Sequence, residues 1–562
     1  MPRKRRSPVN RRIRLLLAIL LLVFAALLGR ATWLQGVRAE SLSRLAARQH
    51  RETVVLPASR GTIYDRMGVQ LAIGEQATTV YADPQQVRDP RLVASAAAKA
   101  LGLSVAHLYT QLLDRRRSFF YVERKADPQR AAPLERRHLA GLGFYPEEHR
   151  RYPQDGVAAH VLGYAGIDNR GLAGLELQLD KTLAGTPGSE TIVRDPFGRA
   201  IDVVDERPER DGRDVFLTID HTIQANAESV LRQTVAKWDA ASATAIVLDP
   251  RNGDVLAMAD APGFDANRFG ETSPSVSRNR AVTDVYEPGS TFKLITVAGA
   301  LSELLVTPQT SFVLPYSIDV ADRTIHDAEP RGTETMSVAR ILAHSSNVGA
   351  ITLAERLGRD RLYSWIRRFG FGRPTEVGFP GESAGFVPSP EKWSGSTIGN
   401  VPIGQGIAVT PVQIAAAYGA VANGGVWVQP HLVDHVQGHP GVRPKVRRVL
   451  SRGIAAELNA MLQNVVLEGT GTLAAVPGYK VAGKTGTAQV PDGHGGYAQD
   501  RYVASFVGMV PASDPQLVVL VVVNEPRNAI WGGIVAAPAF AQIAAYDLQY
   551  LEVPPDAGSA HG

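Results

Sequence analysis

An apolar segment close to the N-terminus constrains the fold of this chain most, because it cannot lie on a water-exposed surface. Residues 15–29 read LLLAILLLVFAALLG, and the apolar character continues beyond Arg30 to Val37. A helix that crosses a bilayer needs about 20 such residues. Residues 13–37 reach that length if Arg14 and Arg30 extend towards the lipid headgroups. We therefore predict a single transmembrane helix over residues 13–37. A cleaved signal peptide is the alternative, but no Ala-x-Ala cleavage site follows the segment.

The charged residues before this segment predict its orientation. The first 14 residues contain seven Lys and Arg residues and no acidic residue, and such positive flanks remain in the cytoplasm. We expect residues 1–12 to form a basic cytoplasmic tail. The rest of the chain is then exported across that membrane. The whole chain has 60 Lys and Arg against 55 Asp and Glu; without those seven, 53 cations remain, so the basic charge does not indicate nucleic-acid binding.

The exported part is long enough for more than one domain, and its character changes near residue 215. Residues 38–215 mix short β-like stretches with turn residues and bring no nucleophile, base and acid together. We interpret them as a non-catalytic pedestal domain of mixed α/β structure. Residues 553–562 read VPPDAGSAHG and are expected to be a disordered tail. The chain has no cysteine, which excludes disulfides, thiolate metal ligands and a lipidated cysteine.

Strand signals at both ends of residues 216–552 predict an α+β domain. Residues 243–262 read as a β-hairpin that turns at Asn252-Gly253. Residues 221–238 have helical spacing, and the middle of the domain, including residues 337–358, is mostly helical. Three further strand candidates lie near the end of the domain: 479–490, 502–511 and 517–526. We predict one antiparallel sheet built from the two ends of the domain and flanked by helices.

Ser290 and Lys293 form a Ser-x-x-Lys motif where a polar loop becomes an apolar helix, in EPGSTFKLITVAGAL. Residues three apart share a helix face, so the amine is expected beside the hydroxyl. Burial in an apolar segment lowers the pKa of an amine, and a neutral amine can accept the proton of a serine nucleophile. For an isolated match, an N-capping serine with a solvent-exposed lysine is the more common interpretation.

Two further motifs follow in the chain. Ser345-x-Asn347 lies in ILAHSSNVGAITL, where adjacent polar residues require hydrogen-bond partners. Lys484-Thr485-Gly486 lies in VAGKTGTAQV, a strand pattern in which the glycine lets another backbone approach. Such an edge strand could pair with an extended peptide, and the lysine could attract a carboxylate. A buried hydrogen-bond network and a surface lysine are the structural alternatives.

The order of the motifs distinguishes these interpretations. A second Ser-x-x-Lys, Ser389–Lys392, follows Ser345, and a second Ser-x-Asn, Ser277–Asn279, precedes Ser290. Only the set that begins at Ser290 therefore occurs in the order Ser-x-x-Lys, Ser-x-Asn, Lys-Thr-Gly, which is the set of penicillin-binding proteins and class A β-lactamases.

Two competing motifs carry less weight. GESAG at residues 381–385 matches the nucleophile elbow of α/β-hydrolases, but prolines flank it where a strand and a helix are required. His326-Asp327 is joined by no further metal-ligand pattern, so we interpret it as structural.

Over nearly its whole length the chain resembles the class B penicillin-binding proteins, which are membrane-anchored peptidoglycan D,D-transpeptidases. RGTIYDRMG (60–68) and residues 160–188 resemble the pedestal domain of that family. YEPGSTFK (286–293), SSNVG (345–349), residues 469–489 and GGIVAAPAF (532–540) resemble its transpeptidase domain. SSNVG, FPGE (379–382) and KTGTA favour the division-type members, known as penicillin-binding protein 3. GQG (404–406) departs from the Gly-Tyr-Gly expected in many of them.

The resemblance implies roles for the motif residues. The catalytic residues would be Ser290, Lys293, Ser345 and Lys484, and the substrate-binding residues Asn347, Thr485, Gly486 and Thr487. Ser290 would attack the carbonyl between the last two D-alanines of a stem peptide, with Lys293 as general base. The departing D-alanine would receive its proton through Ser345, under the influence of Lys484. No metal and no organic cofactor is implied.

The resemblance also implies partners: stem peptides ending in D-Ala-D-Ala, β-lactams as inhibitors, the membrane, a SEDS-type glycosyltransferase (FtsW-like) and other division proteins. Three alternatives remain at this point. They are an elongation-type transpeptidase (penicillin-binding protein 2), a β-lactamase or D,D-carboxypeptidase of the same fold, and a non-catalytic scaffold that binds the cell wall. The spacer of residues 38–215 and the anchor disfavour a freely diffusing β-lactamase.

Overall fold

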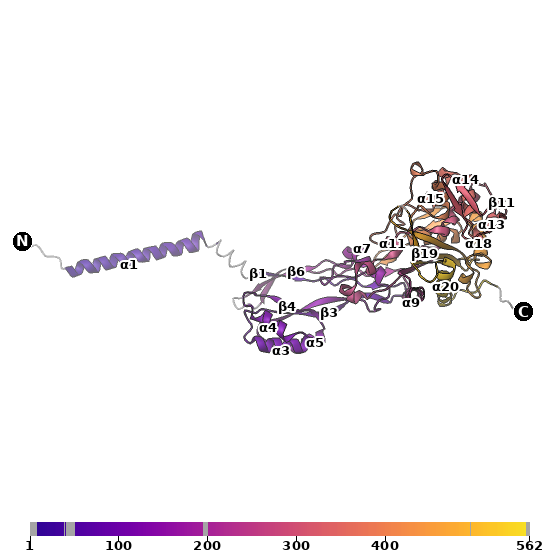
Figure 1. Cartoon of the computed structure of the whole chain (residues 1–562). Coiled ribbons are helices and arrows are strands. Elements are labelled where there is room, and N and C mark those ends of the chain that lie inside the picture. Colours follow the sequence, from indigo (N-terminus) through magenta and orange to yellow (C-terminus); the bar gives the residue numbers. More distant parts are fainter. Residues whose placement is uncertain (1–7, 39, 41–50, 195–199, 495, 558–562) are drawn as a thin grey trace, which may run out of the picture. The chain divides into compact units, whose positions relative to one another are not determined.

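The structure is a computed structural model, and it describes residues 8–38, 40, 51–194, 200–494 and 496–557 (Figure 1). The chain divides into two compact units. One comprises Met1–Ala58 and Gly185–Asp211, and the other comprises Ser59–Ala184 and Gly212–Gly562. Each unit is described by itself.

The first unit contains the apolar N-terminal segment. Helix α1 spans Pro8–Thr32 and continues as a π-helix over Trp33–Val37. Residues 11–37 are long and apolar enough to cross a membrane, and none of the most apolar window is buried. The guanidinium groups of Arg30 and Arg38 lie 4.8 and 4.4 Å from the Trp33 ring, as expected at an interface. A three-stranded antiparallel sheet completes the unit, in the order β1 (Arg51–Leu56), β6 (Gly188–Arg194) and β7 (Ala200–Arg207).

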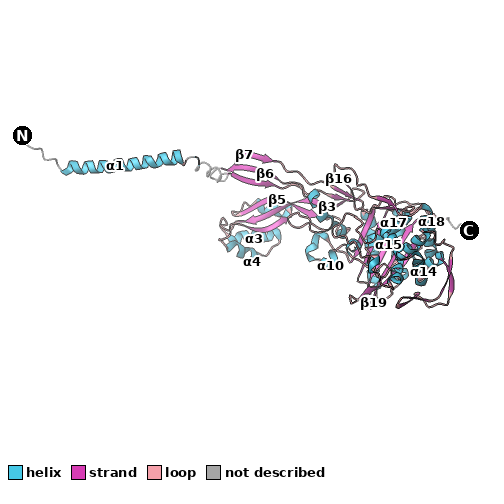
Figure 2. Ribbon diagram, turned by 90° about the horizontal axis from the view of Figure 1, so that it is seen from above, coloured by secondary structure: helices cyan, strands magenta, loops and turns pink. Residues whose placement is uncertain are grey.

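The second unit begins with the pedestal sheet. Long strands β3 (Gln70–Ala82) and β5 (Leu142–Arg151) pair antiparallel, and β4 (Phe120–Ala126) pairs with the end of β3. Helices α3 (Pro90–Leu101), α4 (Val105–Leu113) and α5 (Pro128–Glu135) form an apolar core with this sheet (Figure 2). The side chain of Asp89 caps the first turn of α3, and Gly102 ends the helix at φ +77°.

The pedestal sheet also includes strands from residues 212–562. β2 (Ile63–Tyr64) pairs with β8 (Val215–Leu217), which pairs with β16 (Val433–Val436). The rings of Tyr64, Phe216 and His435 stack across these three strands, with centroid separations of 4.9 and 4.3 Å. The predicted boundary between residues 215 and 216 therefore lies inside a strand, because β8 belongs to a sheet shared by both parts.

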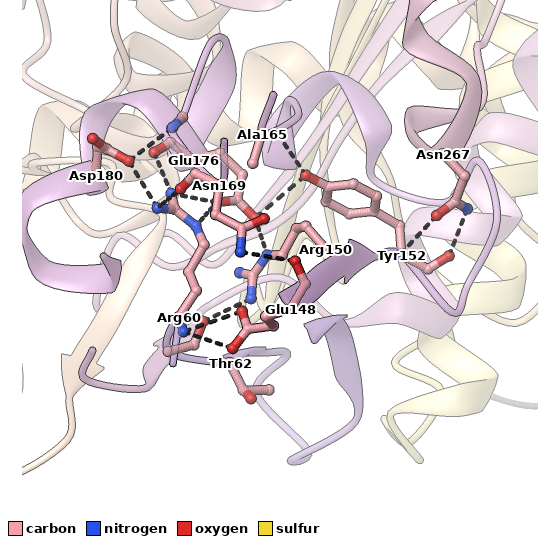
Figure 3. A network of polar contacts seen from close by, with 12 residues as sticks. Arg60, Thr62, Glu148, Arg150, Tyr152, Ala165, Asn169, Glu176, Asp180 and Asn267 are labelled. Carbon is pink, nitrogen blue, oxygen red and sulfur yellow. Dashed lines mark hydrogen bonds and ion pairs between the residues drawn. The ribbon is translucent and has the colours of Figure 1, made fainter. Parts of the chain in front are cut away.

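A buried ionic network fixes the pedestal loops (Figure 3). The carboxylate of Glu176 accepts hydrogen bonds from Arg60 Nε and Arg150 Nε, both at 2.7 Å. Arg60 also binds Asp180 at 2.8 Å, and its backbone N–H donates to the carboxylate of Glu148. All three side chains of the Arg60–Glu176–Arg150 set are at most 2% exposed. A buried carboxylate between two guanidinium groups is held by charge-assisted hydrogen bonds.

The catalytic part has the predicted α+β architecture. Its five strands run antiparallel in the order β10-β9-β20-β19-β18, so both ends of the domain contribute to one sheet. Helices α9 and α20 contact one face, and α17 and α18 contact the other. The strands are β9 (Ser242–Leu248), β10 (Val255–Ala261), β18 (Ala482–Pro491), β19 (Tyr497–Val510) and β20 (Leu517–Asn524). The helices are α9 (His221–Trp238), α17 (Pro411–Ala422), α18 (Arg452–Leu467) and α20 (Ala537–Tyr550).

A helical layer lies beyond α17 and α18. It contains α12 (Lys293–Ser302), α13 (Val338–Ala343), α14 (Asn347–Leu357) and α15 (Arg359–Phe369). Short two-stranded antiparallel sheets flank it: β11 (Ser311–Leu314) with β14 (Glu334–Ser337), β12 (Ser317–Val320) with β13 (Arg323–His326), and β15 (Val426–Val428) with β17 (Val446–Arg448).

Residues 337–358 are mostly helical, as expected. They form α13 and α14, and the chain breaks between the two helices, where Ser345 adopts φ +58°. One expectation from the sequence needs correction. The expected disordered tail is wrong for residues 553–557: the carboxylate of Asp556 accepts hydrogen bonds from Lys480 N and Ser513 Oγ. Residues 558–562 lie outside the described residues.

Candidate active site

Ser290 lies in a tight turn at the edge of a cavity of about 770 Å³. The turn is a 3₁₀ helix over Gly289–Phe292, and α12 begins directly after it at Lys293. Side chains three apart eclipse one another in a 3₁₀ helix, so the turn directs Ser290 and Lys293 to the same side. The Ser290 hydroxyl makes no hydrogen bond with any described residue, which leaves it available to a ligand in the cavity.

Lys293 is almost fully buried, with 1% of its surface exposed. Its Nζ donates to the Ser345 carbonyl oxygen at 2.5 Å and to Asn347 Oδ1 at 2.7 Å, and it lies 3.2 Å from Ser345 Oγ. Burial lowers the pKa of Lys293 to about 7, although the negative charge of Asp327 opposes the change. The amine of the first motif is therefore bound to both residues of the second.

The carboxylate of Asp327 binds the backbone of the Ser-x-Asn turn. One carboxylate oxygen accepts the backbone N–H groups of Asn347 at 2.5 Å and Val348 at 3.0 Å, at the N-terminus of α14. Ser346 Oγ donates to the same carboxylate at 3.0 Å and caps the helix by accepting the N–H of Gly349. Arg331 Nε completes the ion pair at 2.9 Å. The structural interpretation of Asp327 holds, but its contact with the motif could not be read from the sequence.

The side chain of Asn347 has a defined orientation. Its Nδ2 donates to the carbonyl oxygen of His326 at 2.8 Å while its Oδ1 accepts from Lys293. A reversed amide would place two donors together and two acceptors together. The amide oxygen therefore faces the amine, on the cavity side of the turn.

The third motif lies on β18, an edge strand of the sheet. Lys484 is fully buried, and its Nζ lies 3.3 Å from both the carbonyl oxygen and Oγ1 of Thr485. Burial, together with the nearby charge of Lys293, holds the pKa of Lys484 well below its ordinary value. Neither amine forms an ion pair with a carboxylate of the described residues, so both are kept in an environment that penalises charge.

Thr485 and Thr487 present their side chains to the cavity. Thr485 Oγ1 lies 2.7 Å from Thr470 Oγ1, and Thr487 Oγ1 accepts the backbone N–H of Gly532 at 3.1 Å. Thr470 was not identified from the sequence, because no sequence pattern around it indicates a contact with Thr485. Trp531 also lines the cavity and is 45% exposed, and no pattern in the sequence assigned it.

Glycines allow β18 to lie directly against the turn that carries Ser290. A Cβ at Gly486 would lie 2.3 Å from Ser505 Oγ and 3.0 Å from the carbonyl oxygen of Pro288. Gly289 has φ +54°, and a Cβ there would lie 2.7 Å from the carbonyl oxygen of Thr487. A Cβ at Gly404, in the GQG segment, would lie 2.1 Å from the carbonyl oxygen of Gly289. These close approaches fix the position of the turn.

The cavity thus brings together residues from all three motifs. Its lining includes Ser290, Ser345, Asn347, Thr485 and Thr487, while Lys293, Lys484 and Gly486 are buried around it. Two of the serines considered above do not line it: neither Ser383 of the GESAG segment nor Ser389 of the second Ser-x-x-Lys is among the lining residues.

Comparison with known families agrees with this geometry. Residues 243–545, more than half of the chain, match the penicillin-binding protein transpeptidase domain. Residues 55–217 match the penicillin-binding protein dimerisation domain. This chain belongs to the class B penicillin-binding proteins. The family and the fold predicted from the sequence are confirmed.

Relatives of this class B penicillin-binding protein cover almost its full length. Stage V sporulation protein D of Bacillus subtilis is 35% identical over 569 residues, which include 98% of this chain and 87% of the relative. The peptidoglycan D,D-transpeptidase FtsI of Escherichia coli is 32% identical over 558 residues, with 98% and 93% covered. The crystal structure of penicillin-binding protein 3 from Mycobacterium tuberculosis, complexed with aztreonam, has a TM-score of 0.71 at 32% identity and covers 89% of this chain and 98% of its own.

Proposed function

We propose that this penicillin-binding protein is a serine D,D-transpeptidase that cross-links peptidoglycan stem peptides through an acyl-enzyme at Ser290. One observation carries the assignment of roles: the buried amine of Lys293 contacts both Ser345 and Asn347 behind the cavity that Ser290 lines. The D,D-transpeptidase activity of relatives supports the reaction type.

The contacts of Lys293 explain how it acts as a base. A neutral amine has two N–H groups and one lone pair. The Ser345 carbonyl and Asn347 Oδ1 are acceptors only, and they take the two N–H groups. The lone pair is then left for a hydroxyl proton. With a pKa of about 7, a substantial fraction of Lys293 is neutral near neutral pH.

Acylation then proceeds with balanced protons. The Ser290 proton passes to Lys293 as Oγ bonds to the carbonyl carbon of the penultimate D-alanine. The C–N bond to the terminal D-alanine breaks, and its nitrogen receives a proton through the Ser345 hydroxyl, which lies 3.2 Å from Lys293 Nζ. Lys484 biases this transfer by its nearby amine. The amine of a second stem peptide attacks the ester, Ser290 regains its proton, and a cross-link results.

Backbone and hydroxyl groups of the cavity bind the substrate. The backbone N–H groups of Ser290 and Thr487 form the oxyanion hole, since the glycine contacts hold β18 against the serine turn. The hydroxyls of Thr485 and Thr487 bind the terminal carboxylate, and Asn347 faces the peptide backbone of the stem. Gly486 keeps the strand edge open to an extended peptide. β-Lactams mimic the terminal dipeptide and acylate Ser290 without rapid release.

The test is acylation of the full chain, in detergent, by a fluorescent penicillin. Ser290→Ala abolishes labelling without loss of the thermal unfolding transition. Ser383→Ala and Ser389→Ala are matched controls, because each removes the serine of a competing motif, and both retain full labelling. Labelling that persists in Ser290→Ala, or is lost in either control, contradicts the assignment.

The cellular role is proposed from the division-type motifs and the apolar helix. The division-type motifs SSNVG and KTGTA support a septal role beside a SEDS-type glycosyltransferase, with the apolar helix as a single-pass anchor and the catalytic domain in the periplasm. Depletion of the protein followed by microscopy tests this: filaments without septa support division, and rounded cells indicate elongation. Rapid hydrolysis of penicillin by the purified chain would instead indicate a β-lactamase or carboxypeptidase.

A further inference from the structure

A second, smaller pocket lies where the C-terminus of α15 meets the two-stranded sheet of β15 and β17. Its volume is about 200 Å³, and it shares no lining residue with the active-site cavity. Aromatic and polar groups line it together with three cations. The lining residues that matter here are Arg373, Thr375, Glu376, Trp427, Lys445 and Arg447.

The cations of this pocket exceed its anions. Lys445 forms an ion pair with Glu376, which is the one acidic side chain among the lining residues. Arg373 and Arg447 form no ion pair with any carboxylate in the described part of the chain, and neither does the neighbouring Arg368. The pocket therefore presents two uncompensated guanidinium groups.

Arg447 is held in place although its surroundings oppose its charge. Its guanidinium lies 4.3 Å from the centre of the Trp427 ring, and Nη1 donates to the carbonyl oxygen of Arg368, at the end of α15. The absence of a side chain at Gly370 makes room for it, because a Cβ there would lie 3.0 Å from Nη2. Burial and repulsion from Arg373 and Arg368 lower the pKa of Arg447 to about 10.

Such an arrangement costs stability unless an anion completes it. The carbonyl groups at a helix C-terminus compensate only about half a charge. Guanidinium groups match the geometry of phosphate oxygens with paired hydrogen bonds. The charge of a phosphate group near pH 7 is about −1.5 to −2, which is close to the uncompensated charge of the lining. The small volume favours one or two such groups over a nucleotide.

We propose that this pocket is a binding site for a phosphate-class anion, held between Arg373 and Arg447 beside Trp427. The site is separate from the transpeptidase cavity, so it does not depend on the proposed function. The phosphate can belong to a free anion or to a lipid headgroup, since both offer the same oxygens to the two guanidinium groups.

The test is isothermal titration calorimetry of the full chain in detergent at low ionic strength. One arm uses inorganic pyrophosphate, and the other uses dihexanoyl phosphatidic acid below its critical micelle concentration. Arg447→Gln and Arg373→Gln each raise the Kd by at least about tenfold. Arg443→Gln is the matched control, because it removes one exposed arginine outside the pocket, and it changes the Kd less than about twofold.

The outcomes separate the two sources of phosphate. Binding of both probes, or of pyrophosphate alone, supports a site for a free anion, and pocket-dependent binding of the lipid alone supports a headgroup site. Circular dichroism of each variant shows whether it is folded, and Arg373→Gln is informative even if Arg447→Gln unfolds, since Arg373 is exposed. Binding that is absent, or that Arg443→Gln weakens as much as the pocket variants do, overturns the proposal.

Discussion

The active site contains two buried lysine amines that lie close enough to repel each other when charged. Lys293 and Lys484 both have lowered pKa values, and the charge of Lys293 is among the causes of the shift at Lys484. Burial is the main cause of both shifts, because removal from water penalises the charged form of an amine. Asp327 is the anion that acts on Lys293, and it does so while binding the backbone of the Ser-x-Asn turn.

The lowered pKa predicts how acylation depends on pH. Below about pH 7 Lys293 gains a proton and loses the lone pair that accepts the Ser290 proton. The second-order rate constant for acylation by a penicillin therefore rises with pH, with a midpoint at about 7, and is constant above about pH 8. Stopped-flow measurements from acid to alkaline pH check this. A rate that is flat or that falls across this range is inconsistent with a neutral amine as the base.

At the residue scale the motifs could be predicted from the sequence, but their supports could not. The spacing of the motif residues could be recognised, and in Ser-x-x-Lys it predicted an amine beside a hydroxyl. The motif residues are Ser290, Lys293, Ser345 and Lys484. Asp327 lies on a different segment from the turn it binds, and its role depends on the fold bringing β13 to the start of α14. No local pattern encodes such a contact.

At the scale of elements, β18 and the serine turn pack closely because Gly289 and Gly486 let their backbones approach each other. Gly404 contributes from a third segment, where its N–H donates to the carbonyl oxygen of Val401 and its carbonyl oxygen accepts the N–H of Gly289. The position of Ser290 therefore depends on residues more than 100 positions away in the chain.

Gly404 and Gly406 provide a matched pair of substitutions. Both have positive φ, at +80° and +72°, so an alanine costs about 1 kcal/mol of backbone strain at either position. Only at Gly404 does the new Cβ also meet backbone, 2.1 Å from the Gly289 carbonyl oxygen, while nothing lies within 4 Å at Gly406. We expect Gly404→Ala to slow penicillin acylation by at least about tenfold, and Gly406→Ala by less than about threefold. Equal rates in the two variants would show that the turn tolerates displacement.

Sequence patterns predicted the elements where side chains alternate or repeat. The helix α9 and the strands of the sheet follow from such patterns, and strands at both ends of the domain predicted that the two ends share one antiparallel sheet. The order of the strands within that sheet was not predicted. The position of the break between α13 and α14 could not be read from the spacing of ILAHSSNVGAITL. The left-handed backbone of Ser345 and the local N-cap of Ser346 interrupt the helix there, and Asp327 adds a tertiary cap.

At the scale of the molecule, the stability of the pedestal depends on the buried set Arg60, Glu176 and Arg150. Removing the charge of one partner leaves the others buried and uncompensated, which costs about 3–5 kcal/mol. Glu176→Gln is therefore expected to lower the Tm of the full chain markedly in a calorimetric scan.

An exposed ion pair supplies the control for this substitution. Glu75 binds Arg151 at 3.3 Å on the same sheet, with side chains 41% and 56% exposed. Glu75→Gln changes stability by less than about 1 kcal/mol, because solvent screens the pair. If Glu176→Gln unfolds at the same temperature as Glu75→Gln, the buried network does not hold the pedestal together.

The joint between the two parts of the chain was the feature least accessible from sequence. β8 and β16 lie more than 200 residues apart, and each is three or four residues long. Strands this short carry little periodic signal, and pairing at such separation leaves no local trace. The predicted boundary at residue 215 was placed by a change in composition. Composition cannot show that β8 pairs with strands of both parts.

That shared sheet determines how movement passes through the protein. The strand sequence β16-β8-β2-β3 is a continuous hydrogen-bonded ladder with a column of stacked rings along it. Bending at residue 215 would require backbone hydrogen bonds between β2, β8 and β16 to break. We therefore expect this connection to be rigid. For the same reason, we expect a partner that displaces the pedestal to displace the catalytic domain at β16 as well. A flexible linker would not transmit such a movement.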